Sequence, residues 1–292
     1  MGSAVTGVPA KVRIVEVGPR DGLQNQEKTL LTEQKLEFIR LLADAGLQDI
    51  EVSSFVHPQW VPQLADAEQL FPQLPRAANI RYSALVPNLK GLERALRVNV
   101  SRIAVFTAAS ETFNKKNINM SIAESLTTIG AVVKRAAEEG ITVRGYVSTC
   151  FVCPYEGKVS KEKVFDVARE LFNSGVDEVS IGDTIGAATP VDVEETAGGL
   201  VERFSADRLA MHFHDTYGMA VANVFASLRL GISVFDSSTG GIGGCPYAPG
   251  ATGNVATEKL HYLFERLGIQ DGVSSPRLQQ AVQYIQSQLR SS

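Results

Sequence analysis

Residues 12–22 read Val-Arg-Ile-Val-Glu-Val-Gly-Pro-Arg-Asp-Gly, and this stretch sets the unit from which the rest of the chain is built. Its β-branched half predicts a strand, and its second half predicts a polar turn. Residues 32–45 then place apolar side chains at helical spacing, with Thr32 as the expected N-cap and Gly46 as the expected stop. A strand, a polar turn and an amphipathic helix form the repeating unit of a parallel α/β fold.

The same unit recurs along the chain. Further strands are predicted at 49–55, 80–86, 102–107, 142–149, 178–183, 208–215 and 234–238, and helical patterns lie between them at 91–98, 122–139, 161–173, 191–204 and 220–230. Eight such units predict an α/β fold of the (β/α)8 TIM-barrel type over about residues 12–267. A short C-terminal helical extension is expected at 274–290, so that residues 1–292 form a single domain. An open doubly wound sheet is the alternative, but no Gly-x-Gly-x-x-Gly follows the first strand.

Composition excludes several classes of protein. The formal net charge of −4 shows no basic field for nucleic acid, and no run of about 18 apolar residues predicts a membrane span. The first ten residues lack the pattern of a secretory or transit signal, and three cysteines are an odd number for a disulfide framework. We therefore expect a cytoplasmic protein.

Two of the four histidines stand at the end of one predicted strand, in Met211-His-Phe-His-Asp-Thr-Tyr-Gly218. Side chains alternate along a strand, so His212 and His214 point to one face and Phe213 to the other. Converging imidazoles indicate a metal site. The alternative is a polar pair that only forms hydrogen bonds at the strand terminus.

Polar residues gather where the predicted strands end, which is the end of a TIM barrel that carries active sites. They are Arg20, Asp21, Glu51, Ser54, Tyr146, Ser180, Asp183, His212, His214, Cys245 and Asn254. For two of them a purely structural role is the alternative to a role in the active site, because Asp183 and Asn254 could each cap a following helix. Two imidazoles, the Asp21 carboxylate and the Asn254 amide form a mixed nitrogen and oxygen set that suits Mg²⁺ or Mn²⁺. The same residues also fit a non-haem iron centre.

The cysteines divide into two groups. Cys150 and Cys153 form an isolated Cys-x-x-Cys followed by Pro154, without a second pair for zinc and without a thioredoxin-like context. Cys245 lies instead in the glycine-rich stretch 240–247, whose flexibility would let a thiol close over a bound substrate.

Six motifs together resemble the 3-hydroxy-3-methylglutaryl-CoA lyase family, which belongs to a superfamily of metal-dependent TIM barrels. They are Gly-Pro-Arg-Asp-Gly-Leu-Gln-Asn-Gln at 18–26, Ser-Phe-Val-His-Pro-Gln-Trp-Val-Pro at 54–62, Lys-Lys-Asn-Ile-Asn at 115–119, Cys-Pro-Tyr-Glu-Gly at 153–157, His-Phe-His-Asp-Thr-Tyr-Gly at 212–218 and Gly-Gly-Ile-Gly-Gly-Cys-Pro-Tyr at 240–247. The Arg-Asp-Gly and His-x-His elements are typical of the whole superfamily, whereas the cysteine loop is specific to the lyases. The chain departs from the family at His57, where relatives often carry serine, and at Phe213, where many carry cysteine.

The resemblance implies a role for each candidate residue. Asp21, His212, His214 and Asn254 would be the metal ligands, and Arg20 would polarise the thioester carbonyl of an acyl-CoA substrate. Catalytic roles are implied for Glu51, Asp183, His212 and Cys245, and substrate contacts for Ser54, Tyr146 and Ser180. The resemblance also implies a homo-oligomer, with a dimer favoured, and a place in leucine degradation or ketone-body metabolism.

The implied reaction is a retro-Claisen cleavage that needs a base, an acid and positive charge near the developing enolate oxygen. Asp183, His212 and Cys245 are candidates for the proton transfers, and the sequence does not assign them. Four other interpretations stay open: a lyase for a bulkier 3-substituted substrate, an acetyl-CoA-condensing synthase on the same scaffold, a non-haem iron oxygenase, and an inactive barrel that serves as a binding module. The short sequence after the barrel and the Cys245 loop favour cleavage over condensation.

Overall fold

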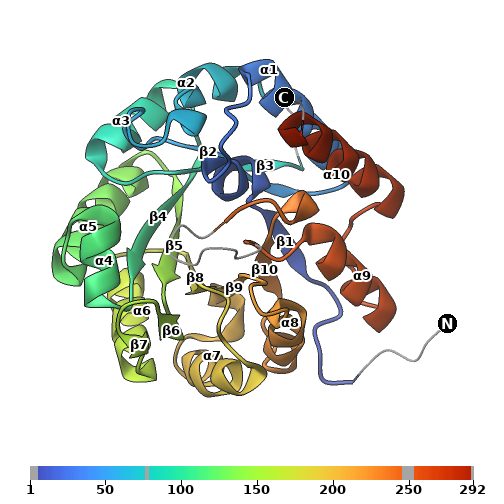
Figure 1. The fold of residues 1–292 in the computed structure, drawn as a ribbon. Coiled ribbons are helices and arrows are strands. Elements are labelled where there is room, and N and C mark those ends of the chain that lie inside the picture. Colours follow the sequence, from blue (N-terminus) through green and yellow to red (C-terminus); the bar gives the residue numbers. More distant parts are fainter. Residues whose placement is uncertain (1–5, 76–78, 245–252, 291–292) are drawn as a thin grey trace.

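A closed barrel of parallel strands forms the centre of the molecule (Figure 1). The computed structural model describes residues 6–75, 79–244 and 253–290. The first strand pairs with both the second and the last, for example Val15 with Asp49 and Arg13 with Val234, and this double pairing closes the barrel. The barrel strands, in chain order, are β1 (Arg13–Glu16), β2 (Asp49–Ser54), β3 (Arg81–Leu85), β4 (Arg102–Ala108), β5 (Thr142–Ser148), β8 (Glu178–Asp183), β9 (Leu209–Phe213) and β10 (Val234–Ser237).

Helices surround the barrel and cover its outer face (Figure 1). They are α1 (Thr32–Asp44), α2 (Ala67–Leu70), α3 (Leu89–Arg97), α4 (Glu111–Ile118), α5 (Ile122–Glu138), α6 (Lys161–Asn173), α7 (Pro190–Phe204), α8 (Ala220–Arg229), α9 (Thr257–Leu267) and α10 (Ser275–Arg290). The longer helices turn an apolar stripe inward, as α1 does by burying Phe38, Ile39 and Leu42 completely. The TIM-barrel prediction is therefore confirmed. Among the described residues, no helix is both long and apolar enough to cross a membrane.

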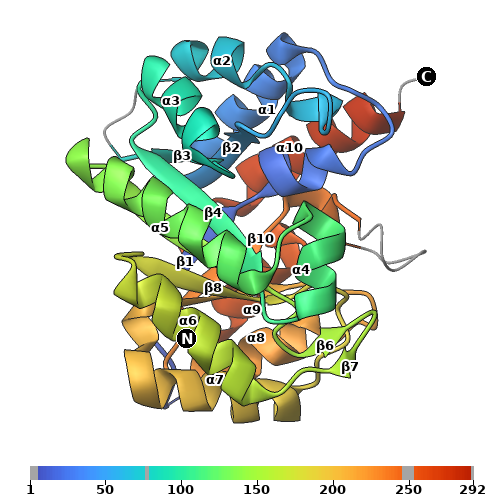
Figure 2. The same ribbon diagram turned by 90° about the vertical axis from the view of Figure 1, so that its left-hand side faces the viewer.

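The C-terminal helical extension is also present, as α10, and it packs beside α1 in both views (Figures 1 and 2). Its buried side chains Leu278, Ala281 and Ile285 join the main apolar core. The tail thus shields a helix of the barrel's outer layer.

Local details differ from the sequence predictions. The N-cap of α1 is Leu31 rather than Thr32, because the Gln34 side chain accepts the Leu31 backbone N–H at 2.8 Å while the Thr32 hydroxyl donates to Asp66. Gly46 does follow the end of α1, in the left-handed region at φ +97°.

Short elements beside the barrel escaped prediction. The two-residue strands β6 (Val152–Cys153) and β7 (Gly157–Lys158) form a hairpin that lies beside α4, where the Thr112 backbone N–H donates to Glu156 at 2.7 Å (Figure 2). Such strands are too short to show an alternating pattern.

Candidate metal centre

A turn after β1 carries Arg20 and Asp21 to the carboxyl end of the barrel. It is a five-residue helical turn, Gly18–Gly22, in which the Val17 carbonyl accepts the backbone N–H groups of Arg20, Asp21 and Gly22. A Cβ atom at Gly18 would lie 2.6 Å from the Glu16 carboxylate, so glycine is required for this close approach. The tight turn fixes both side chains over the barrel.

Asp21, His212 and His214 form a cluster that can hold a metal ion. One potential ligand atom from each residue lies within 4.8 Å of the others, and the two imidazole centroids are 5.2 Å apart. Phe213 points the opposite way and stacks on Phe151 in the apolar core, as the alternation of a strand predicts. The structure therefore brings together three of the residues that the sequence predicted as metal ligands.

Asn254 completes the cluster from another part of the chain. Backbone hydrogen bonds join its segment to the end of β9, from Val255 N–H to the Phe213 carbonyl and from Asp215 N–H to the Gly253 carbonyl. The Asn254 side chain donates to Asp21 Oδ2 at 2.8 Å. It is not the cap of α9, whose N-cap is Ala256, so the local alternative for this residue is wrong.

The donor set fits a divalent cation. Asn254 Oδ1 and His214 Nδ1 are both buried and find no hydrogen-bond partner among the residues that the structure describes. Buried polar atoms without a partner cost stability, which a bound cation would offset. Two imidazoles, a carboxylate and an amide oxygen match the preferences of a divalent ion that also keeps positions for substrate oxygens.

The charges at the cluster also suit cation binding. Burial opposes ionisation of Asp21, but Arg20 and the two histidines outweigh it and hold its pKa at about 2. Burial, together with the neighbouring His212, lowers the pKa of His214 to about 4. At neutral pH the cluster therefore offers a carboxylate and a neutral His214 imidazole, the protonation states that metal binding needs.

Arg20 is held beside the cluster by three groups. Its Nη1 donates to Asp21 Oδ1 at 2.6 Å, its Nε donates to Glu51, and its guanidinium lies over the Tyr146 ring at 5.4 Å. The Tyr146 hydroxyl in turn donates to Glu51 Oε2 at 2.9 Å. Burial alone would lower the pKa of Arg20, but the carboxylates of Glu51 and Asp21 raise it. A permanent positive charge is thus fixed next to the candidate metal site.

Two further predicted residues, Ser180 and Ser54, have contacts of their own. Ser180 donates to Asp236 Oδ2 at 2.9 Å, inside the barrel. The Ser54 hydroxyl accepts the backbone N–H of Val56, a contact within its own loop. Cys245 lies outside the described residues.

Asp183 closes the loop that leads to α7. Its two carboxylate oxygens accept the backbone N–H groups of Ala187 and Ala188 at 3.0 and 3.1 Å, whereas the N-cap of α7 is Thr189. The residue therefore holds the loop rather than capping the helix. Burial raises the pKa of Asp183 to about 7.

This raised pKa predicts that metal-free protein loses stability with rising pH. A carboxyl whose pKa is about 7 when folded and 3.8 when unfolded binds its proton more tightly in the folded state, so its contribution is present at low pH and is lost between about pH 4 and pH 7. Asp183→Asn has no such proton, so its free energy of unfolding should not fall in this way. From pH 5 to pH 8 the variant's free energy of unfolding should rise relative to that of the wild type by on the order of 2 kcal/mol. Urea unfolding at both pH values measures this difference, with the exposed Asp166→Asn as control. An equal difference at both pH values would contradict the assignment.

Two residues that the sequence did not single out, the buried Asp236 and the partly buried Arg144, connect to the cluster. Asp236 on β10 accepts from His212 Nδ1 at 3.2 Å through Oδ2 and pairs with Arg144 Nη2 at 2.7 Å through Oδ1. Arg144 on β5 also donates to the Tyr146 hydroxyl at 3.0 Å. The sequence does contain a signal for them. Arg144 and Asp236 are each the only charged residue in a predicted strand, and each lies two positions before a residue near the strand end, on the same face as that residue.

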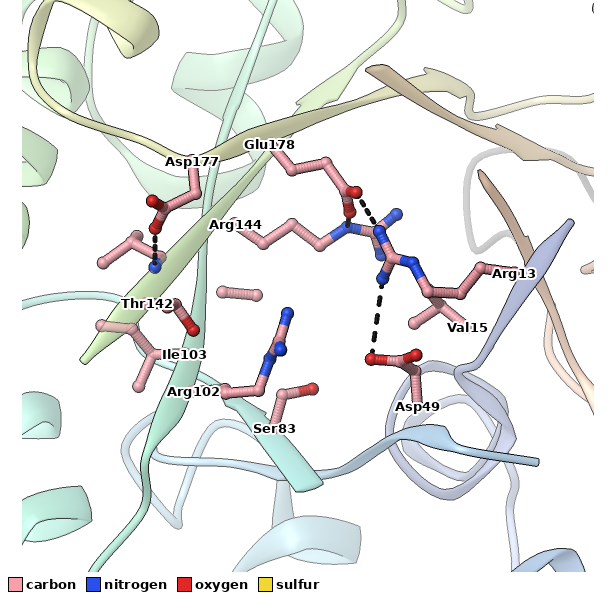
Figure 3. Close-up of a pocket in the computed structure, with 12 residues that line it drawn as sticks. Arg13, Val15, Asp49, Ser83, Arg102, Ile103, Thr142, Arg144, Asp177 and Glu178 are labelled. Carbon is pink, nitrogen blue, oxygen red and sulfur yellow. Dashed lines mark hydrogen bonds and ion pairs between the residues drawn. The ribbon is translucent and has the colours of Figure 1, made fainter. Parts of the chain in front are cut away.

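Arg144 also extends toward the opposite, amino-terminal end of the barrel (Figure 3). A small cavity of about 40 Å³ lies there, and Glu178 bridges Arg144, whose Nε is 2.9 Å away, and Arg13. The polar interior is thus continuous from this cavity to the metal cluster. The cavity itself lies at the end of the barrel away from Arg20 and the histidines.

Comparison with known proteins gives the family. A family model described as HMGL-like matches residues 11–285. The chain is 47% identical over 281 residues to a hydroxymethylglutaryl-CoA lyase of Bacillus subtilis (strain 168), covering 96% of this chain and 94% of that protein. It is 46% identical over 283 residues to the mitochondrial hydroxymethylglutaryl-CoA lyase of Homo sapiens, covering 97% and 87%.

Solved structures agree with these relatives. A crystal structure of hydroxymethylglutaryl-CoA lyase from Pseudomonas aeruginosa superimposes with a TM-score of 0.96 at 48% identity, covering 98% of this chain and 96% of that one. An HMG-CoA lyase from Acinetobacter baumannii, solved with coenzyme A and 3-methylmalate, gives a TM-score of 0.92 at 34% identity over 98% and 93%. With a match of this extent in sequence and in fold, the chain belongs to the HMGL-like family, among the hydroxymethylglutaryl-CoA lyases.

Proposed function

We propose that this protein cleaves 3-hydroxy-3-methylglutaryl-CoA to acetoacetate and acetyl-CoA with the help of Mg²⁺ or Mn²⁺. The observation that carries the proposal is the contact of 2.6 Å between Arg20 Nη1 and Asp21 Oδ1, which joins a fixed positive charge to a cluster of candidate metal ligands. A thioester carbonyl beside Arg20 and a tertiary hydroxyl beside the ligands would place both ends of the breaking carbon–carbon bond in one site.

The chemistry follows from this arrangement. A base removes the proton of the tertiary hydroxyl, the carbon–carbon bond breaks, and its electrons pass into the thioester enolate, which then takes up a proton. When bound, a divalent cation supplies the charge that favours loss of the hydroxyl proton. Arg20 stabilises the enolate oxygen, and Glu51 and Tyr146 keep its guanidinium in place.

Among the candidates for the proton transfers, Asp183 has an acidity that suits the task. Its pKa of about 7 lets it accept and release a proton near neutral pH. His212 is held by Asp236 and belongs to the metal cluster. We propose Ser180 and Ser54 as substrate contacts on the family resemblance alone.

Metal dependence is the central test of this function. Purified protein should form acetoacetate from 3-hydroxy-3-methylglutaryl-CoA, lose this activity after exhaustive chelation, and regain it with Mg²⁺ or Mn²⁺, because the open ligand set suits both ions. Full cleavage without metal would contradict the metal assignment. Failure to cleave in the presence of either ion would contradict the function.

Cys245 is proposed as the loop thiol that exchanges a proton with the reacting centre. Cys245→Ala should keep substrate binding but lower turnover on the order of 10²-fold, the usual scale for one acid or base. Cys150 and Cys153 are the matched controls, since both are buried and Cys150 Sγ donates to the Val147 carbonyl at 3.0 Å. Steady-state assays of the three alanine variants measure this. A fully active Cys245→Ala beside an inactive Cys150→Ala would overturn the assignment.

Other parts of the proposal rest on resemblance. We infer a single catalytic domain, a homodimer, a role in leucine degradation and a cytoplasmic location. Named relatives include both mitochondrial and cytoplasmic lyases of Homo sapiens, each 46% identical to this chain. Sedimentation at equilibrium tests the oligomeric state.

A further inference from the structure

A second group of reactive side chains lies on the outer helices, away from the metal cluster. His261 on α9 hydrogen-bonds through Nδ1 to Asp271 Oδ2 at 2.7 Å and through Nε2 to Ser275 Oγ at 2.8 Å. The loop between α9 and α10 that carries Asp271 pairs with the chain just before β1, where Lys11 bridges to Gln270. These three residues therefore lie near the amino-terminal end of the barrel, opposite Arg20 and the histidine cluster.

The hydrogen bonds fix the direction of proton donation. An ionised carboxylate only accepts, and Asp271 Oδ1 already accepts the Val273 backbone N–H at 3.0 Å. When His261 is in its neutral form, its Nδ1 atom carries the proton that Asp271 Oδ2 accepts. Its Nε2 is then a free base, and the Ser275 hydroxyl must donate to it. A hydroxyl, a base and an orienting carboxylate in this order form the arrangement of an activated nucleophile.

The surroundings support nucleophilic reactivity. The side chains of His261 and Asp271 are only 9% and 7% exposed, whereas Ser275 is an exposed residue. The base is thus shielded from water while the oxygen remains accessible. Ser275 is the first residue of α10, a helix of 16 residues, whose N-terminal backbone N–H groups and dipole favour negative charge.

We propose that Ser275, His261 and Asp271 form a second reactive centre in which Ser275 is acylated by small activated esters or thioesters. Ser275 Oγ forms a bond to the acyl carbon and transfers its proton to His261 Nε2. The bond from the acyl carbon to the leaving oxygen or sulfur breaks, and the leaving group departs as an anion that takes the proton from His261. This centre is independent of the proposed lyase function.

The test uses the whole wild-type protein with p-nitrophenyl acetate as the acyl donor, and a fluorophosphonate probe in parallel. Release of nitrophenolate should accompany an acetyl group on the peptide that contains Ser275, identified by mass spectrometry. Ser275→Ala should remove this modification, while the neighbouring Ser274→Ala should keep it. His261→Gln should slow acylation on the order of 10²-fold, as for loss of a general base. Asp271→Asn makes the same test if the His261 variant does not fold.

Two outcomes would overturn the proposal. One is a wild-type protein without acyl or phosphonyl label at Ser275. The other is equal labelling in wild type and in folded His261→Gln or Asp271→Asn protein, since the serine would then react without its base. Cleavage of 3-hydroxy-3-methylglutaryl-CoA by Ser275→Ala serves as the check on folding, so that failure here and failure of the lyase function are distinguished.

Discussion

Arg20→Lys is expected to lower turnover by at least about 10²-fold although it preserves the positive charge. The guanidinium of Arg20 uses Nη1 for Asp21 and Nε for Glu51 while its face lies over Tyr146. A lysine ammonium is a compact charge on a flexible stem and cannot hold this planar geometry. The stabilisation of the enolate oxygen should be lost most, because that charge develops only in the transition state.

The measurement separates turnover from binding. Steady-state kinetics should show a large fall in kcat with a smaller change in KM. Arg97→Lys, an exposed substitution at the end of α3, is the matched control and should behave as wild type. Because Arg20 also contacts Asp21, Mn²⁺ affinity is measured by electron paramagnetic resonance, to separate a metal defect from a catalytic one. Turnover within about threefold of wild type, far from the 10²-fold scale of a lost donor, would remove Arg20 from the mechanism.

The fold could be predicted because its signal is repeated and local. Most barrel strands have consecutive apolar residues bounded by a turn, and the strand at Glu178–Asp183 was placed without error. The failures are elements whose stability comes from tertiary contacts. Helix α4 buries Phe113 and Asn114 but lacks a regular apolar stripe, and the backbone N–H of Thr112 in its first turn donates to Glu156 of the β6–β7 hairpin.

The candidate site could be predicted where it follows from strand ends. The rule that barrel sites form at the carboxyl ends of strands brings together Arg20, Asp21 and the two histidines. The same rule misses Asp236 and Arg144, because both lie inside their strands rather than at the strand ends. No local pattern shows that these two residues, on the non-adjacent strands β10 and β5, pair with each other. The contact of Ser54 with Val56 could not be predicted from the sequence either. A serine near a strand end can accept a backbone N–H in a turn as readily as it can contact a substrate.

Of the two residues that this rule misses, Asp236 is expected to affect metal binding, because it orients the candidate ligand His212. Its side chain is fully buried and connects His212 and Ser180 through Oδ2 with Arg144 through Oδ1. Burial would raise the pKa of Asp236, but Arg144 and His212 lower it, so the group is a carboxylate that accepts from His212 Nδ1. This leaves Nε2 of His212 as the nitrogen with a lone pair for a cation.

Asp236→Asn should reverse that arrangement without changing the size of the side chain. Arg144 requires an acceptor, so the amide oxygen of the asparagine should face its guanidinium and the amide NH₂ should face His212. His212 Nδ1 must then accept, which moves the imidazole proton to Nε2 and removes the lone pair. Metal affinity is expected to fall by about 10- to 100-fold, and cleavage at limiting metal should fall with it.

The control for Asp236→Asn is a substitution of Glu178, the other carboxylate that pairs with Arg144. Glu178→Gln also removes a carboxylate partner of Arg144, whose Nε lies 2.9 Å from Glu178 Oε1, but Glu178 lines the amino-terminal cavity rather than the histidine cluster. Mn²⁺ titrations followed by electron paramagnetic resonance, with thermal unfolding to confirm folding, should show weakened binding in Asp236→Asn and near wild-type binding in Glu178→Gln. If both variants weaken metal binding equally, the effect reflects the charge of Arg144 or the packing of the barrel interior. A positioning role for Asp236 requires that Mn²⁺ affinity fall in Asp236→Asn, which changes the hydrogen bond to His212 Nδ1, and not in Glu178→Gln, which leaves that bond intact.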